Sequence, residues 1–237
     1  MDHIILPDSV ERPLTFYLSM EEYVAAAYGC GFFVWRVAPT VIIGRNQDLE
    51  TEVNVPFCMQ HGINVVRRKS GGGCVYADRG NLMLSYITPQ KGVDLVFREF
   101  LDKFAAALCG LGLPAVCTAH NDILVDGCKV SGNAFFSLPK GSIVHGTLLH
   151  SVDFEMLSQA ITPTKDKLEK HGIQSVRQRV ANLTSLGLDL SMDELADYLI
   201  HAFCDGERCL DGTDIEGIND LEKRYKNPIF DELWTKN

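Results

Sequence analysis

A cationic, glycine-rich stretch at residues 67–82, with the sequence RRKSGGGCVYADRGNL, has the most obvious chemistry in this chain. Glycine has no Cβ, so its backbone can approach a ligand closely and can adopt positive φ. Exposed amide N–H groups beside guanidinium and ammonium groups would hold a carboxylate or a phosphate. Apolar residues predict strands at 63–66 and 75–76, so a plain hairpin connection is the alternative interpretation.

The stretch matches neither of the common phosphate-binding motifs. In a P-loop the lysine follows the last glycine, whereas Lys69 precedes Gly71 here. In the dinucleotide-binding motif the glycines are spaced apart before a helix, whereas here they are contiguous. The pattern therefore predicts an anion site without naming its ligand.

A second stretch, 121–134 (NDILVDGCKVSGNA), predicts a β-hairpin around an Asp-Gly turn. Alternation along a strand places Lys129 and Ser131 on one face, and Cys128 on the other. Lys129 is either a solvated edge residue or a cation held against a phosphate or carboxylate. In the second case Asp122 could carry a magnesium ion, which prefers a few carboxylates with phosphate oxygens and water.

Two further segments are ambiguous when each is taken alone. His145, in the sequence HGTLL, would ordinarily be a structural strand histidine. The cations between residues 165 and 179 would ordinarily form a solvated surface loop. The sharper interpretation is that this cluster and the cations at 67–69 surround one anionic ligand or partner.

The surrounding sequence predicts helices at 16–28, 93–111, 154–159 and 192–203, with Ser19 as a cap in the first of them. Strands are expected at 32–37, 40–43, 82–87, 116–118 and 142–150. Helices and strands alternate without a strict βαβ order. This predicts an α+β fold with a mixed, largely antiparallel sheet flanked by helices.

Composition narrows the class of protein. The chain has 237 residues, 46% of them hydrophobic, and a net charge of −9, which disfavours wholesale nucleic-acid binding. No apolar run approaches the roughly eighteen residues of a membrane span, and the N-terminus lacks a signal-peptide pattern. The eight cysteines form no Cys-x-x-Cys pair, which favours reduced thiols in a cytoplasmic protein.

Taken in order, these segments resemble the lipoate–protein ligases of the lipoate/biotin protein ligase superfamily. The resemblance covers about residues 14–185, and the order and spacing of its segments are more specific than any one motif. It implies one catalytic domain over 1–237, with a helical, acidic extension at 186–237. The matching segments are FYLSMEE (16–22), WR (35–36), VIIGRNQ (41–47), the glycine-rich stretch, ND (121–122), KVSG (129–132), HGTLL (145–149) and 165–183.

The resemblance implies an enzyme that uses Mg-ATP to convert lipoate to lipoyl-adenylate and pyrophosphate. The lipoyl group then passes to a lysine of a lipoyl-domain protein, either an E2 subunit of a 2-oxoacid dehydrogenase or a glycine cleavage H protein. Lys129 is implied as the catalytic lysine, Asn121 and Asp122 as nucleotide ligands beside it, and Asp122 as the metal ligand. The residues implied to contact lipoate or the adenylate are Trp35, Arg68, Ser70, Gly71, Gly72, Gly73, Tyr76, Asn81, Ser131, His145 and Gly146. We expect a cytoplasmic monomer with no nucleic-acid or membrane partner.

The sequence departs from the family in two respects. Ala77 stands where the family commonly has His, so no imidazole role is expected there. Many full ligases also carry a C-terminal accessory domain of about a hundred residues, which is not found before Asn237. We therefore expect a weak or incomplete ligase that needs a separate accessory protein.

Two other functions share the features described above. A lipoyl or octanoyl transferase would use a cysteine thioester and no ATP, and Cys74 beside the glycines would be its better nucleophile than Cys128. A non-catalytic lipoate-binding module is the second alternative. A biotin ligase is less consistent with the sequence, because the Gly-Arg-Gly-Arg type of loop is missing.

Overall fold

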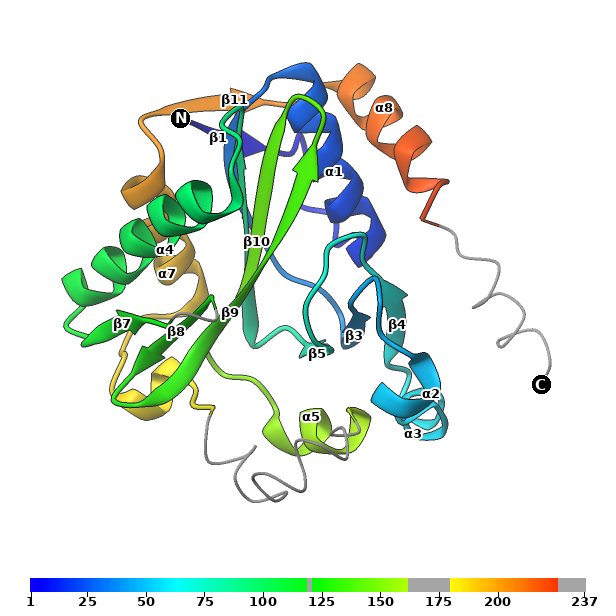
Figure 1. Cartoon of the computed structure of the whole chain (residues 1–237), viewed down its shortest axis with the longest axis vertical. Coiled ribbons are helices and arrows are strands. Elements are labelled where there is room, and N and C mark those ends of the chain that lie inside the picture. Colours follow the sequence, from blue (N-terminus) through cyan, green and yellow to red (C-terminus); the bar gives the residue numbers. More distant parts are fainter. Residues whose placement is uncertain (119–120, 162–179, 226–237) are drawn as a thin grey trace.

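The computed structural model describes residues 1–118, 121–161 and 180–225 (Figure 1). The basic cluster at 165–179 lies outside these ranges, so its predicted place beside the glycine-rich stretch stays a prediction. The strands are β1 (Asp2–Ile5), β2 (Gly31–Trp35), β3 (Thr40–Ile43), β4 (Asn64–Arg67), β5 (Val75–Ala77), β6 (Asn81–Thr88), β7 (Ala115–Cys117), β8 (Asp122–Val125), β9 (Cys128–Leu138), β10 (Gly141–Leu149) and β11 (Gly206–Cys209). The helices are α1 (Leu14–Ala27), α2 (Leu49–Glu52), α3 (Val55–Gln60), α4 (Val93–Gly110), α5 (Phe154–Ala160), α7 (Met192–Phe203) and α8 (Gly212–Glu222), with a 3₁₀ turn, η1, at Leu183–Leu186.

Two sheets organise the described residues. The larger has eight strands in the order β11-β1-β2-β6-β10-β9-β8-β7, and the smaller has three in the order β4-β3-β5. In the larger sheet β1 runs parallel to β2 and β11, and the remaining pairs are antiparallel. The predicted mixed, largely antiparallel α+β fold is confirmed.

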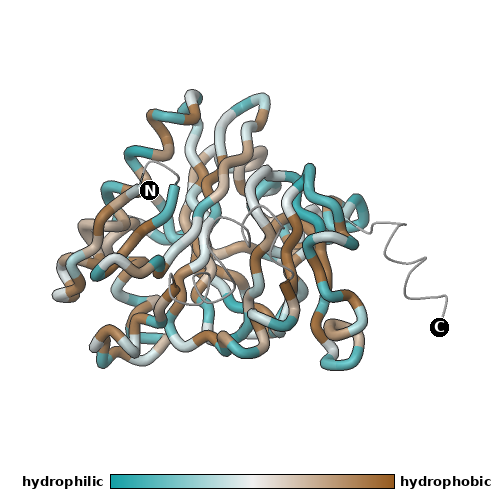
Figure 2. Tube along the Cα trace, turned by 60° about the horizontal axis from the view of Figure 1, so that its bottom comes forward, coloured by the Kyte–Doolittle hydropathy of each residue, from teal (hydrophilic) through white to brown (hydrophobic). Residues whose placement is uncertain are grey.

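Three hydrophobic clusters hold the helices to the sheets. One lies between the large sheet and helices α4 and α7, where Phe100 and Phe203 are buried and in contact. A second joins the other face of that sheet to α1 and α8. The third joins the small sheet to α3 and α5. Figure 2 shows hydrophobic residues along the central strands and hydrophilic residues at many of the turns. The large sheet is therefore covered on both faces.

Helix α1 begins earlier than the sequence pattern suggested. It starts at Leu14 after Pro13, so Ser19 lies inside the helix and donates to the carbonyl of Thr15 at 2.8 Å. The prediction of Ser19 as a cap is wrong, because proline before the first turn sets the start of the helix. Glu21 and Glu22 consequently lie in the middle of α1, where they can reach the glycine-rich stretch.

The C-terminal part is more regular than its acidic composition suggested. β11 extends the sheet by parallel pairing with β1, and α8 packs on α1. In α8, Asp211 and Asp214 form a reciprocal capping box. These aspartates therefore start a helix, which a simple count of negative charge does not reveal.

Candidate active site

The glycine-rich stretch is a crossing between strands and not a hairpin tip. β4 and β5 flank it, and both pair with β3, which lies between them. The hairpin alternative is therefore wrong. We call residues 68–74 the glycine loop. It is tied to the end of β3, because the amide of Arg68 donates to Ile43 and the carbonyl of Ser70 accepts from the amide of Arg45.

Arg68 holds the glycine loop from inside. Its guanidinium donates to the carbonyls of Ile42 (3.1 Å), Gly71 (2.8 Å) and Gly73 (2.7 Å). Burial lowers the pKa of Arg68 to about 10, so the group remains charged at neutral pH. A Cβ on Gly44 would lie 2.1 Å from the carbonyl oxygen of Gly72, so only glycine fits there. The loop carbonyls are thus turned into the protein.

The glycine amides of the same loop are left unpaired among the described residues. The N–H groups of Gly71, Gly72 and Gly73 donate to no acceptor among the described residues. Gly72 has a positive φ of 91°, which reverses the backbone direction within the loop. Inward carbonyls and unpaired amides are the arrangement that a backbone anion site needs.

A chain of polar side chains links the loop to the large sheet. Nε2 of His145 lies 2.7 Å from Oγ of Ser70, and its Nδ1 lies 2.9 Å from the carboxylate of Glu21. Ser85 donates to Glu21 at 2.6 Å, and the indole of Trp35 donates to Ser85 at 2.9 Å. His145 is therefore oriented from both of its nitrogens, and Ser70 is held by it.

The second predicted motif forms the expected hairpin. Asp126 and Gly127 both have positive φ, at 50° and 78°, as a tight Asp-Gly turn requires. The register shifts at Leu124, which pairs with Lys129, so a β-bulge lies beside the lysine. Nζ of Lys129 forms an ion pair with Asp122 at 2.8 Å. A Cβ on residue 132 would lie 2.9 Å from Nζ, so Gly132 leaves room for the lysine.

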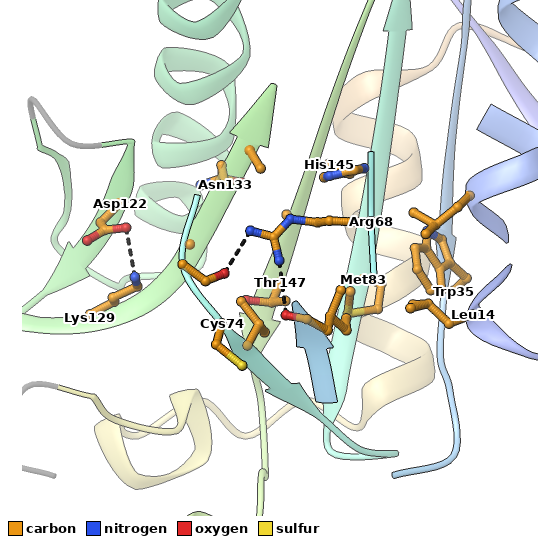
Figure 3. Close-up of a pocket in the computed structure, with 17 residues that line it drawn as sticks. Leu14, Trp35, Arg68, Cys74, Met83, Asp122, Lys129, Asn133, His145 and Thr147 are labelled. Carbon is orange, nitrogen blue, oxygen red and sulfur yellow. Dashed lines mark hydrogen bonds and ion pairs between the residues drawn. The ribbon is translucent and has the colours of Figure 1, made fainter. Parts of the chain in front are cut away.

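A cavity of about 330 Å³ joins these elements. Figure 3 shows Leu14, Trp35 and Met83 on one side of Arg68, and the Asp122–Lys129 pair on the other. The cavity is thus apolar at one end and charged at the other. Of the predicted site residues, those that line it are Trp35, Arg68, Gly73, Asp122, Lys129, His145 and Gly146.

The other predicted site residues lie outside the cavity lining. Tyr76 is buried in the third hydrophobic cluster, and Asn81 accepts from the amide of Asp78 at 2.9 Å. Asn121 has a positive φ of 66°, and its carbonyl accepts from the side chain of Asn133. The side-chain amide nitrogen of Asn133 also donates to Oγ of Ser131, at 3.2 Å. Asn121 and Ser131 therefore position Asn133, which does line the cavity.

Sequence reasoning missed several residues of the site. Glu21 is 2% exposed within an apolar helix, and a buried acid is the signal that could have marked it. Asn133 follows the predicted KVSG segment, and its Oδ1 is buried without a partner among the described residues. That oxygen would lie 1.9 Å from a Cβ at residue 146, which explains why glycine occupies this position. Leu14, Leu18, Ile42, Val75, Met83 and Thr147 also line the cavity.

The ligand atoms at the charged end of the cavity fit a metal ion that would be held mainly by the enzyme's substrate. Within residues 1–118, 121–161 and 180–225, no group of three or more His, Cys, Asp or Glu side chains is placed so that it could hold a metal ion. Asp122 offers one carboxylate at the charged end of the cavity, which suits magnesium when phosphate oxygens and water complete the shell. Ala77 is fully buried in the second hydrophobic cluster and offers no ligand atom.

The fold and the site together define a ligase-type catalytic domain, and the comparisons show its family. A family model described as the lipoyl protein ligase A/B catalytic domain matches residues 13–204. The chain belongs to this family. A lipoate-protein ligase of Bacillus subtilis is 39% identical over 199 residues, which is 80% of this chain and 60% of that relative. The chain thus spans less than two thirds of the length of that curated relative.

Solved structures agree with this assignment. A bi-partite lipoate protein ligase from Thermoplasma acidophilum superposes with a TM-score of 0.82 at 28% identity, covering 96% of this chain and 94% of that one. A lipoate-protein ligase A with bound ATP superposes with a TM-score of 0.80 at 27% identity, covering 95% and 96%. Among the described residues, no helix is both long and apolar enough to cross a membrane.

Proposed function

We propose that this protein activates lipoate with ATP and passes the lipoyl group to a lysine of a lipoyl-domain protein. The cavity carries the proposal, because it joins an apolar end at Trp35 and Met83 to a charged end at Asp122 and Lys129. An eight-carbon acyl chain suits the first end, at about 0.8 kcal/mol for each buried CH₂. A carboxylate and phosphates suit the second. The solved ATP complex of a relative supports the choice of nucleotide.

The proposed chemistry has two steps. A carboxylate oxygen of lipoate attacks the α-phosphorus of ATP, and the bond to pyrophosphate breaks. The acceptor amine then attacks the acyl carbon, AMP leaves, and the amine loses a proton. Lys129 would neutralise the α-phosphate and the acyl oxygen in both steps, and the unpaired amides of Gly71–Gly73 would bind the remaining negative charge. Holding both anions in one cavity also orients them for attack.

We propose magnesium as the counter-ion of the phosphates. Bound there, it would neutralise the charge that develops on the leaving pyrophosphate. Asp122 would hold it, and Lys129 would then exchange its carboxylate partner for the substrate anion. Asn121 is proposed as a nucleotide contact through its position directly before Asp122.

The transferase alternative has less support. Cys74 lines the cavity, but burial raises the pKa of its thiol to about 12, so the thiolate that such a mechanism needs is scarce at neutral pH. Cys128 is not among the residues that line the cavity. A non-catalytic binding module would not need the paired Asp122 and Lys129.

The domain and partner assignments are also proposals. We propose one catalytic domain that works with a separate accessory protein. The Thermoplasma relative, a bi-partite ligase whose chain this one nearly covers, supports this arrangement. The lipoylation system of that archaeon includes an E2 lipoyl domain, which supports an E2-type acceptor. All eight cysteines are free, which supports a reducing compartment such as the cytoplasm.

Lipoate-dependent exchange of pyrophosphate into ATP tests the first step directly. We expect exchange that requires lipoate, survives Cys74→Ser and is lost in Lys129→Ala. Lys140→Ala is the matched control, because Lys140 is exposed in the turn between β9 and β10. Acyl transfer between carrier proteins without exchange would support the transferase, and lipoate binding with neither activity would leave a binding module.

A further inference from the structure

The glycine loop is held from outside by a residue near the C-terminal end of the described chain. Nζ of Lys69 donates to both carboxylate oxygens of Glu22, at 2.7 and 2.9 Å. The hydroxyl of Tyr225 donates to the same carboxylate at 2.6 Å. Nζ of Lys69 also lies 4.4 Å from the centroid of the Tyr225 ring. We call these three side chains, Lys69, Glu22 and Tyr225, the latch.

The latch joins three parts of the chain that are far apart in sequence. Lys69 belongs to the glycine loop, Glu22 to α1, and Tyr225 to the turn after α8. Helix α8 is itself fixed on α1, because Asp214 accepts from Tyr23 at 2.8 Å and Tyr28 at 2.5 Å. Figure 1 shows α8 lying alongside α1. Tyr225 is thereby delivered to the loop by a docked helix.

The latch and the hydrogen-bonded side chains around His145 act on neighbouring residues of one loop. Glu22 holds Lys69, and Glu21 holds Ser70 through His145. Two successive acids of α1 thus fix two successive residues of the loop, immediately before the unpaired amides of Gly71–Gly73. A shift of the loop of about 1 Å would move those amides out of hydrogen-bond reach of an anion.

We propose that Tyr225 is a positioning residue, which sets the glycine loop for substrate binding through Glu22 and Lys69. The proposal rests on the proposed ligase function, and it adds a role for α8 that no predicted site residue implied. Glu22 is only 17% exposed at its side chain, so its hydrogen bonds are weakly screened by water. Burial and the neighbouring Glu22 raise the pKa of Tyr225, so the phenol remains a donor at neutral and moderately alkaline pH.

Tyr225→Phe tests the proposal, because it removes the hydroxyl and keeps the ring. We expect KM for lipoate and ATP in the exchange reaction to rise by about three- to tenfold, with kcat changed less than about twofold. Tyr23→Phe is the matched control. It removes one phenol–carboxylate bond between α1 and α8 without touching the loop, while the bond from Tyr28 to Asp214 keeps α8 docked. We expect the control to keep the wild-type KM.

Hydrogen exchange gives a second measurement that does not depend on activity. The amide of Arg45 donates to Ser70 at 3.0 Å, and the amide of Arg68 donates to Ile43 at 2.9 Å, so both report on how firmly the loop is seated. We expect about tenfold faster exchange at these amides in Tyr225→Phe than in the wild type or Tyr23→Phe. Unchanged exchange at both amides would overturn the proposal.

The outcomes separate this inference from the proposed function. A wild-type protein with no pyrophosphate exchange would reject the ligase function, while the amide measurement would still test the latch. Lys69→Met in combination with Tyr225→Phe tests the shared role of Glu22. We expect the KM of the double variant to match that of Lys69→Met alone, and fully multiplicative effects would contradict a common latch.

Discussion

Nζ of Lys129 lies 2.8 Å from Oδ1 of Asp122, so the two charged residues at the polar end of the cavity are paired with each other. Lys129 is the second residue of β9, the second strand of the hairpin, and Asp122 begins the first strand, β8. In the proposed reaction each has a different partner, a phosphate for the cation and a metal for the carboxylate. Substrate binding must therefore exchange one ion pair for two.

Lys129→Ala should abolish most of the adenylation activity. The fixed cation has no nearby substitute among the described cavity residues except Arg68, whose guanidinium is already bonded to backbone carbonyls. We expect a loss of about 10²- to 10³-fold in kcat for pyrophosphate exchange. Full activity in this variant would remove Lys129 from the mechanism, and Lys140→Ala should retain wild-type rates.

Asp122→Asn should change the metal requirement more than the lipoate requirement. The amide keeps the size of the side chain but loses the charge that attracts magnesium. We expect the magnesium concentration for half-maximal exchange to rise by about tenfold, with KM for lipoate changed less than about twofold. A magnesium titration measures this, and an equal rise in both constants would argue against a metal role for Asp122.

Gly71→Ala should separate binding from stability. A Cβ at Gly71 meets no atom of the described residues within 4 Å, so the fold should tolerate it. The same methyl group would block the close approach of an anion to the loop amides, and we expect KM for ATP or lipoate to rise by about tenfold. Thermal melting and exchange kinetics would be measured together.

The contrast with Gly44→Ala sharpens that test. A Cβ there would lie 2.1 Å from the carbonyl oxygen of Gly72, and backbone must move to admit it. This variant should therefore lose about 2–4 kcal/mol of folding stability. A Cβ on Gly212, in the first turn of α8, meets no atom of the described residues within 4 Å. Gly212→Ala should therefore leave KM unchanged and should not lower the folding stability.

The Cys74 thiol should be unreactive and should make stability fall at high pH. Burial raises its pKa from 9.0 to about 12 in the folded state, so the folded protein holds this proton where the unfolded chain loses it. Its contribution is complete below about pH 9 and is lost as the pH rises toward 12. The wild type should therefore lose about 1 kcal/mol more than Cys74→Ser between pH 8 and pH 10.

Denaturant titrations at the two pH values, together with alkylation rates, measure these effects. The exposed Cys209 serves as the internal control for alkylation at pH 8. Alkylation of Cys74 as fast as that of Cys209 would show that the thiolate is accessible, and it would reopen the transferase alternative.

Much of the fold was predictable because local signals agreed with it. The apolar spacing at 93–111 produced α4, and the Asp-Gly turn produced the β8–β9 hairpin. In contrast, β11 was not predicted, and the helical extension at 186–237 was predicted without a range for α8. β11 is short and exposed, and its parallel partner β1 is about two hundred residues away in sequence. No local pattern indicates such a pairing.

The sequence by itself determined the residue types that can bind anions and the order of the motifs. Those motifs were sufficient to indicate the family, which the comparisons then established. Only the tertiary structure decided how the residues are used. β3 lies between β4 and β5, so the glycine stretch became a crossing loop and not a hairpin. Arg68 and Lys69, adjacent cations in the sequence, bond to the loop carbonyls and to Glu22 respectively. The reason is physical. Lys69 finds its partner 47 residues away on α1, and the loop carbonyls meet the buried Arg68 only once the loop has folded around it, so both placements depend on packing.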